Sequence, residues 1–295
     1  MNYKLILQLH VHSKRSHDSN VSVEEYVESL GSSLKDNEYG VLGITDHNVM
    51  PLTMREVLRY STKRILVIPG IQWKLYKTFE EALLKLCTRR EVITVGNHDG
   101  LVDYIKEKTN YSVLSNGELS GNFTEDEFAD YLSSCKNLAI IIPHPRHLFF
   151  DYYGRREIKN LWFKVRKTGH KFFVEEKTGY DPFPRFFYSY KGKYPIVGSS
   201  DAHRISSFFN ISALFSVETS IQIDEEFIEL WEMAFREKKI DIYEKVIGRI
   251  FALLNEKNSS LVIKKYYLRA IPHVLYSVPA FIKRRFADFP RNLTR

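Results

Sequence analysis

The chain has 295 residues, 44% of them hydrophobic, which is enough to bury the core of a single barrel domain. No apolar run approaches the roughly 20 residues that span a bilayer, and two cysteines, Cys87 and Cys135, are too few and too far apart for a disulfide framework or a thiolate metal site. The formal net charge of +7 is that of residues 261–295, where eight basic residues accompany one acid, so the rest of the chain is neutral in sum.

Short runs of apolar or β-branched residues recur along the chain, and each is followed by a side chain that can bind a metal. Runs of this length and composition are typical of buried strands. In chain order, the predicted strands and the residues that follow them are 4–9 (His10, His12), 41–45 (Asp46, His47), 65–71 (Gln72), 92–95 (His98), 138–142 (His144), 171–174 (Glu175) and 194–197 (Asp201, His203).

Helical patterns separate several of these strands, at 23–33, 54–61, 79–86, 125–134 and 158–168. Alternation of strands and helices predicts parallel strands joined by right-handed crossovers. If such a sheet closes into a barrel, the C-terminal ends of all its strands meet at one face, where barrel enzymes have their active sites. We therefore predict an α/β barrel over residues 1–215, with the metal-binding side chains gathered at its mouth.

The pattern after Ser216 is mostly helical, with amphipathic candidates at 225–235 and 242–254. We expect residues 216–295 to form a helical, basic extension packed on the barrel. Tyrosines and phenylalanines interleave with the cations of its last part, a mixture that can follow a nucleic-acid backbone while stacking on bases. The apolar residues of 263–281 equally indicate a helix packed on the barrel, on a protein partner or on a second copy of the chain.

The first predicted strand ends in His10-Val11-His12. Side chains two positions apart share one face of a strand, so the two imidazoles could bind one metal. An isolated pair of this kind is as readily explained by two exposed histidines. Here most of the chain's ten histidines follow predicted strands, which requires a common cause.

Six segments, in this order, resemble the polymerase and histidinol phosphatase (PHP) superfamily of metal-dependent phosphoesterases. The resemblance covers roughly residues 1–204 and implies a distorted seven-stranded (β/α)7 barrel. The segments are His10-Val11-His12-Ser13 with Asp18, Thr45-Asp46-His47-Asn48, Pro69-Gly70-Ile71-Gln72, His98, Pro143-His144-Pro145, and Ser200-Asp201-Ala202-His203.

The resemblance also implies a site for three metal ions. It assigns one ion to His10, His12 and Asp201, a second to His98 and His144, and a third to Asp18, His47 and His203. His17 is an alternative to Asp18. Among these residues and Gln72, it implies catalytic roles for Asp18, His47, Gln72, Asp201 and His203.

Gln72 departs from the family pattern, which has a glutamate at this position. An amide offers a neutral oxygen but not the negative charge that holds two cations close together, so we expect weaker metal binding there. Three explanations stay open: a natural variant of the site, a glutamate-to-glutamine change that traps an inactive enzyme, and a family member that has lost catalysis.

Two acids and three cations beside the ligands have both a functional and a structural interpretation. Asp46 and Glu175 are candidates for orienting imidazole N–H groups, or for capping a loop. The cations are candidates for pairing with substrate phosphate, or are solvated surface residues. They are Arg146, Lys177 and Arg204.

Imidazole-rich sites without thiolates favour zinc or manganese, with iron as a further option, over magnesium. The two cysteines agree with a reducing cytoplasm, and the resemblance implies an enzyme with two or three divalent ions that hydrolyses phosphate esters by a metal-activated water. A nuclease-like action on nucleotide or nucleic-acid phosphodiesters has a modest lead. The alternatives are a small-molecule phosphomonoesterase and a catalytically silent metal-binding module.

Overall fold

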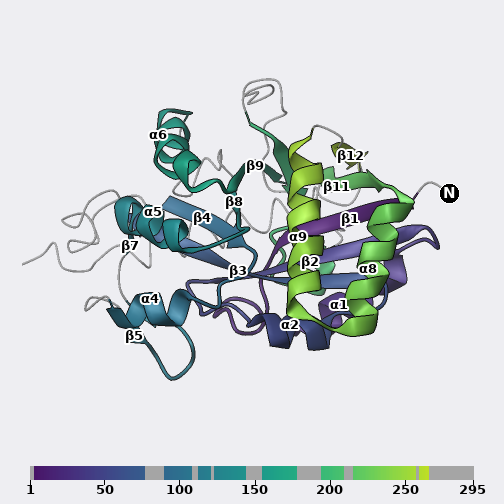
Figure 1. Cartoon of the computed structure of the whole chain (residues 1–295), viewed down its shortest axis with the longest axis horizontal. Helices are drawn as coiled ribbons and strands as arrows, with labels where there is room; N and C mark the ends of the chain where they lie inside the picture. The colour runs from purple at the N-terminus through teal and green to yellow at the C-terminus, as the bar shows by residue number, and fades with distance from the viewer. Residues whose placement is uncertain are drawn as a thin grey trace, which may run out of the picture.

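The computed structural model describes residues 3–76, 90–107, 112–120, 123–143, 155–177, 194–208, 215–256 and 259–265. Ten of its strands form one mixed sheet, and two form a separate hairpin (Figure 1). In sheet order the strands are β10 (Ile196–Ser199), β9 (Lys171–Lys177), β8 (Ala139–Ile142), β4 (Arg90–Val95), β3 (Ile65–Tyr76), β2 (Glu38–His47), β1 (Tyr3–Val11), β11 (Phe215–Ile223) and β12 (Ser259–Lys265), with β7 (Phe123–Thr124) paired to β3 and the hairpin made of β5 (Ser112–Val113) and β6 (Leu119–Ser120).

The large sheet curls until it is nearly closed, because β10 returns to the side of β1 and β11. Val11 and Ala202 form a parallel bridge, and the backbone N–H of His12 donates to the Ala202 carbonyl over 2.9 Å. The N–H of Gly198 donates to Oγ1 of Thr219 over 2.6 Å. The fold is therefore α/β with a barrel-like sheet, and a strand is present at each of the seven predicted places.

The expectation that all seven strands are parallel is wrong at β4. This strand runs antiparallel to both of its neighbours, β3 and β8, and pairs Arg90 with Leu75 and Val95 with Ala139. A strand that is buried on both faces shows the same apolar run whichever way it points, so the sequence did not reveal its direction. The first residue of β4 consequently lies where its neighbours β3 and β8 end.

The expectation of a mostly helical region after residue 216 is wrong for two segments. β11 pairs antiparallel with β1, and β12 pairs antiparallel with β11. Phe215, Val217, Thr219, Ile221 and Ile223 alternate with more polar residues, the period-2 pattern of a strand. The boundary predicted between residues 215 and 216 falls inside β11, and residues 266–295, which hold most of the basic cluster, lie outside the described residues.

Helices flank the sheet, and several begin at a capping box, in which a hydroxyl side chain and a glutamate three residues later bond each other's backbone N–H. The boxes are Ser22 with Glu25, Thr53 with Glu56, and Thr124 with Glu127. The predicted helix at 79–86 lies outside the described residues. The helices are α1 (Val23–Ser33), α2 (Met54–Tyr60), α4 (Leu101–Glu107), α5 (Glu125–Ser134), α6 (Arg155–Val165), the 3-10 helix η1 (Arg166–Thr168), α7 (Ile205–Phe208), α8 (Glu225–Glu237) and α9 (Ile240–Asn255).

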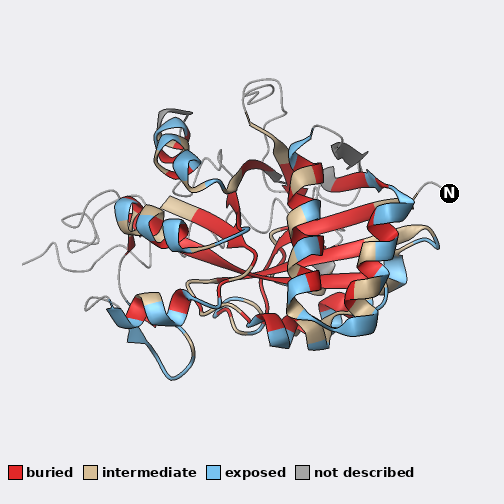
Figure 2. Cartoon of the chain, in the orientation of Figure 1, coloured by how far each residue is buried: buried red, intermediate tan, exposed pale blue. Residues whose placement is uncertain are grey.

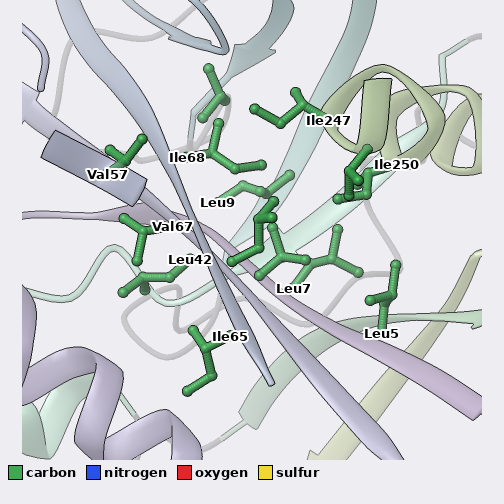
Figure 3. Close-up of a cluster of buried hydrophobic side chains, with 14 of the residues drawn as sticks. Leu5, Leu7, Leu9, Leu42, Val57, Ile65, Val67, Ile68, Ile247 and Ile250 are labelled. Carbon is green, nitrogen blue, oxygen red and sulfur yellow. The ribbon is translucent and has the colours of Figure 1, made fainter. Parts of the chain in front are cut away.

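The main core lies between β1, β2 and β3 and the helices α8 and α9, which cross this part of the sheet (Figures 1 and 2). Figure 3 shows Leu7 and Leu9 of β1 and Ile68 of β3 beside Ile247 and Ile250 of α9. A second core around Trp73 and Phe128 joins β3 to α5. No described helix is both long and apolar enough to cross a membrane.

Candidate metal centre

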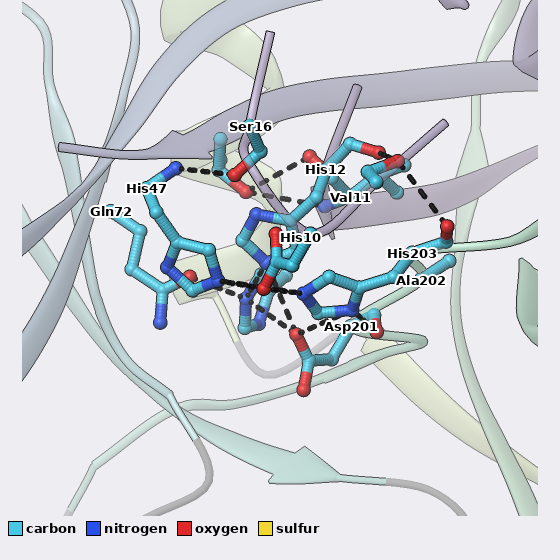
Figure 4. A network of polar contacts seen from close by, with 12 residues as sticks. His10, Val11, His12, Ser16, His47, Gln72, Asp201, Ala202 and His203 are labelled. Atoms are coloured by element: carbon cyan, nitrogen blue, oxygen red, sulfur yellow. Dashed lines mark hydrogen bonds and ion pairs between the residues drawn. The ribbon is translucent and has the colours of Figure 1, made fainter. Parts of the chain in front are cut away.

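The side chains at the C-terminal ends of β1, β2, β3, β9 and β10 meet at one end of the barrel-like sheet (Figure 4). The pairs β1–β2, β2–β3 and β9–β10 are parallel, so these ends coincide in space. The loop after β1 adds Asp18. The side chains that meet are His10, His12, His47, Gln72, Glu175, Asp201, His203 and Asp18.

Local backbone features bring the ligands together. The register of β1 against β2 shifts between Gln8 and Val11, and the N–H of Val11 donates to the Thr45 hydroxyl over 3.2 Å. Asp201 has a φ of 49°, in the left-handed region that aspartate tolerates better than most residues. The Tyr26 hydroxyl lies 2.9 Å from the Ala202 carbonyl oxygen, which ties α1 to the segment that carries Asp201.

The first triad consists of His10, His12 and Asp201, whose ligand atoms all lie within 4.8 Å of one another. Nε2 of His10 and Nε2 of His12 are 3.0 Å apart, and each is 3.1 Å from Oδ1 of Asp201. Oε1 of Gln72 lies 3.1 Å from Nε2 of His10. Both imidazoles are fully buried, so these contacts are formed away from bulk water.

Glu175 determines which nitrogen of His10 faces the triad. Its Oε1 lies 2.8 Å from Nδ1 of His10, and because a carboxylate only accepts, Nδ1 must carry a proton. In a neutral His10, Nε2 then carries no proton, and its lone pair faces the oxygens of Asp201 and Gln72. Lone pairs turned toward each other in this way require a cation between them.

Either a proton or a metal ion can be that cation. Burial lowers the pKa of His10, but the facing Glu175 and Asp201 carboxylates raise it to about 10, so a proton is held there in the absence of a metal. Two ligand atoms at about 2.0 Å from a tetrahedral zinc ion are themselves about 3.3 Å apart. The contacts of 3.0 and 3.1 Å in the first triad are close to that separation, so these residues fit a divalent metal.

The second triad consists of His12, His47 and His203 and is supplemented by Asp18. Oδ2 of Asp18 is 3.2 Å from Nε2 of His47 and 3.1 Å from Nε2 of His203. The His12 ring stacks against both other rings, with centroids 4.1 Å from His47 and 4.2 Å from His203. Because His12 belongs to both triads, the two candidate ion positions are adjacent.

The charges of the second triad shift the pKa values of its members. Burial raises the pKa of Asp18, but the hydrogen bonds from His203 and His47 lower it well below its ordinary value. Burial lowers the pKa of His203, but the bond to Asp18 and the charge of Asp201 raise it overall. The pKa of His12 is lowered, first by burial and then by the neighbouring His47.

Exposure increases from the first triad to the second. The side chains of His10 and His12 are 0% exposed, that of His203 is 28% exposed and that of Asp18 is 36% exposed. A solvent-borne ligand would therefore approach from the side of Asp18 and His203.

No model of a known protein family matches the chain, and no curated protein matches it in sequence. The chemistry of the centre therefore has to be inferred from its own residues and geometry.

His98 does not lie with the other predicted ligands, because it follows the antiparallel strand β4 and is carried to the opposite end of the sheet. It is 3% exposed, its Nδ1 is 2.7 Å from the Gly96 carbonyl oxygen, and its Nε2 is 2.7 Å from the Thr94 hydroxyl. Both of its ring nitrogens are engaged in these local hydrogen bonds, and its predicted partner His144 lies outside the described residues, so a metal site formed by the two histidines stays a prediction.

The remaining predicted residues have different outcomes. His144 and Arg146 lie outside the described residues, as does the side chain of Lys177, while Arg204 is exposed beside His203. Of the two interpretations of Asp46, its hydrogen bonds agree with the second, an acid that caps the loop after β1. Its carboxylate accepts from the Ser13 N–H over 2.6 Å and the Ser13 hydroxyl over 2.8 Å, and its burial raises its pKa to about 6. His17 is exposed, with its ring 5.8 Å from that of His47.

Glu91 is a member of the centre that sequence reasoning missed. It lies at the start of β4, and its Oε2 accepts a hydrogen bond from Nε2 of Gln72 over 2.9 Å. A glutamate near the start of an apolar strand was the available signal. It could be used only with the knowledge that β4 runs antiparallel to β3.

Proposed function

We propose that the chain is a metal-dependent phosphoesterase of the PHP type. The observation that carries the proposal is the pair of triads that share His12 at one end of a barrel-like sheet. Two adjacent ions are the arrangement that phosphoesterases use to hold both oxygens of an in-line displacement. The motifs of the sequence support the same family.

The ligand chemistry supports zinc or manganese, with iron as a further option. The described candidates offer imidazole nitrogens and carboxylate oxygens, a set that these metals bind better than magnesium does. When bound, such ions supply positive charge for phosphate oxygens and lower the pKa of water. We propose two or three ions, the number depending on His144, which lies outside the described residues.

The residues of the chain have separable roles in this proposal. Glu175 accepts a hydrogen bond from the Nδ1–H group of His10, which leaves Nε2 of that ring available as a ligand. The backbone carbonyl of Asp201, 3.0 Å from Nδ1 of His203, does the same for that ring. Asp201 also places a carboxylate against His10 and His12, and Asp18 places one against His47 and His203.

For the substrate, we propose a nucleotide or nucleic-acid phosphodiester, on the basis of the basic and aromatic C-terminal residues. A small phosphomonoester is the second candidate. The neutral amide of Gln72 beside His10 favours a third candidate, a metal-binding module without catalysis. We likewise propose that the chain acts in the cytoplasm. We propose that its C-terminal region contacts a protein partner or a second copy of the chain.

The test is hydrolysis of a generic diester, a generic monoester and labelled single-stranded DNA, each with added manganese or zinc. The wild type is compared with Asp201→Asn, which removes the carboxylate from the first triad while keeping its shape. Faster diester than monoester hydrolysis by the wild type, lost in the variant, would support the proposal. A metal-loaded wild type without activity on any of the three would favour the silent module.

A further inference from the structure

Gln72 and Glu91 lie on neighbouring antiparallel strands and share one face of the sheet. Gln72 pairs directly with Ile93, and Glu91 is two residues from Ile93 along β4. Side chains two apart on a strand point the same way, so Gln72 and Glu91 are diagonal neighbours across the ladder. Their contact of 2.9 Å therefore follows from the register of the two strands.

The carboxylate of Glu91 determines how the amide of Gln72 is turned. A carboxylate can only accept, so the amide nitrogen of Gln72 must face Glu91. The amide oxygen then points the other way, 3.1 Å from Nε2 of His10. Gln72 is fully buried, which leaves the amide little freedom to turn around.

We propose that Glu91 is a positioning residue for the first triad: its carboxylate accepts from Nε2 of Gln72, holds Oε1 of Gln72 toward a divalent cation beside His10, and supplies behind the amide the negative charge that residue 72 lacks. The inference rests on the proposed metal centre and adds a residue that neither the sequence motifs nor the triads include. It moves the carboxylate from β3 to β4 while keeping one charge in this part of the centre. In this proposal Gln72 and Glu91 act together in metal binding, and the glutamine at position 72 does not indicate a loss of the metal site.

The hydrogen bond and the charge can be separated by substitution. Glu91→Gln keeps an oxygen that can accept from Gln72 but removes the charge. The double variant Gln72→Glu, Glu91→Gln restores one carboxylate and one amide with their positions exchanged. A merely structural role of the contact predicts that the single variant binds metal like the wild type.

A matched control exists at the far end of β4. There the Asn97 amide donates to the carboxylate of Glu244 on α9, an amide–carboxylate contact remote from the triads. Glu244→Gln removes one negative charge from that contact. It accounts for general effects of net charge and of lost amide–carboxylate contacts on the measured binding.

The experiment is titration calorimetry of the chelator-treated full chain with Zn²⁺, together with thermal unfolding to verify that each variant is folded. We expect Glu91→Gln to weaken Zn²⁺ binding by about 10-fold or more, within the range found for residues that support metal ligands. The double variant should return to within about 3-fold of the wild type, and Glu244→Gln should be unchanged.

Equal Zn²⁺ affinity of the wild type and Glu91→Gln would overturn the role of Glu91 and leave the metal centre intact. A folded double variant that binds as weakly as the single variant would also overturn it, because charge would then not be the missing factor. Absence of Zn²⁺ binding to the wild type would instead refute the metal centre itself.

Discussion

His98 is predicted to make the protein sensitive to acid. The Trp73 indole N–H donates to the Thr94 hydroxyl over 2.8 Å, which in turn lies 2.7 Å from Nε2 of His98. Because Nδ1 donates to the Gly96 carbonyl, Nε2 of the neutral ring accepts the Thr94 proton. A protonated ring has no acceptor for that proton, and it would be buried without a counter-charge in this chain of bonds.

Burial accordingly lowers the pKa of His98 from 6.5 to about 4 in the folded protein. The unfolded chain takes up its proton near pH 6.5, whereas the folded chain resists until about pH 4. The contribution of His98 to the free energy of unfolding is therefore complete above pH 6.5 and is lost as the pH falls to 4. The difference in pKa corresponds to about 3 kcal/mol, of which about 2 kcal/mol is lost by pH 5.

The assay is urea unfolding of the wild type and of His98→Gln at pH 7.5 and at pH 5. The variant lacks the titrating ring, so other acidic and basic groups affect both proteins alike. We expect the stability advantage of the wild type to shrink by about 2 kcal/mol between the two pH values. An advantage that is the same at both pH values would refute the inferred burial of a neutral His98.

Three further changes follow from the structure. Asp201→Asn removes the carboxylate that both His10 and His12 contact, so we expect Zn²⁺ affinity to fall by at least about 10-fold, measured by calorimetry. Zn²⁺ at 100 times its dissociation constant should raise the free energy of unfolding of the wild type by about 2.7 kcal/mol, measured by urea unfolding. The same Zn²⁺ concentration is at most about 10 times the dissociation constant of Asp201→Asn, so it should raise the free energy of unfolding of that variant by no more than about 1.4 kcal/mol. Trp231→Ala empties a fully buried site between α8 and the sheet and should cost about 3–5 kcal/mol in the same assay, and a cost below about 1 kcal/mol would contradict the packing of α8.

The strands of the barrel could be placed from the sequence because each is a compact apolar run, such as Leu138 to Ile142, followed by a polar side chain. Their direction could not be placed, since a strand buried on both faces has no sequence feature that depends on its orientation. The predicted helical region includes β11, although the apolar residues of this strand alternate. The amphipathic patterns of α8 and α9, which follow β11 in the chain, favour a helical prediction for the whole region.

The antiparallel direction of β4 also decides which residues lie at the centre. His10, His12 and Asp201 are predicted together and lie together, because Val11 and Ala202 form a parallel bridge between β1 and the segment after β10. His98 was expected at the mouth and lies at the other end, while Glu91 was overlooked at the place that His98 was to fill. Because β4 runs antiparallel to β3, Glu91 at its start lies beside Gln72, and His98 after its end lies away from Gln72. Only the tertiary structure reveals this strand direction.

We propose that the two triads bind metal ions that are required for phosphate-ester hydrolysis. The most direct measurement is diester hydrolysis by the purified full chain after chelator treatment and again after Mn²⁺ or Zn²⁺ is returned, with metal content determined on the same samples. We expect no activity without metal and restored activity once at least two ions per chain are bound. Hydrolysis that persists in the metal-free protein, or silence at full metal loading, would contradict it.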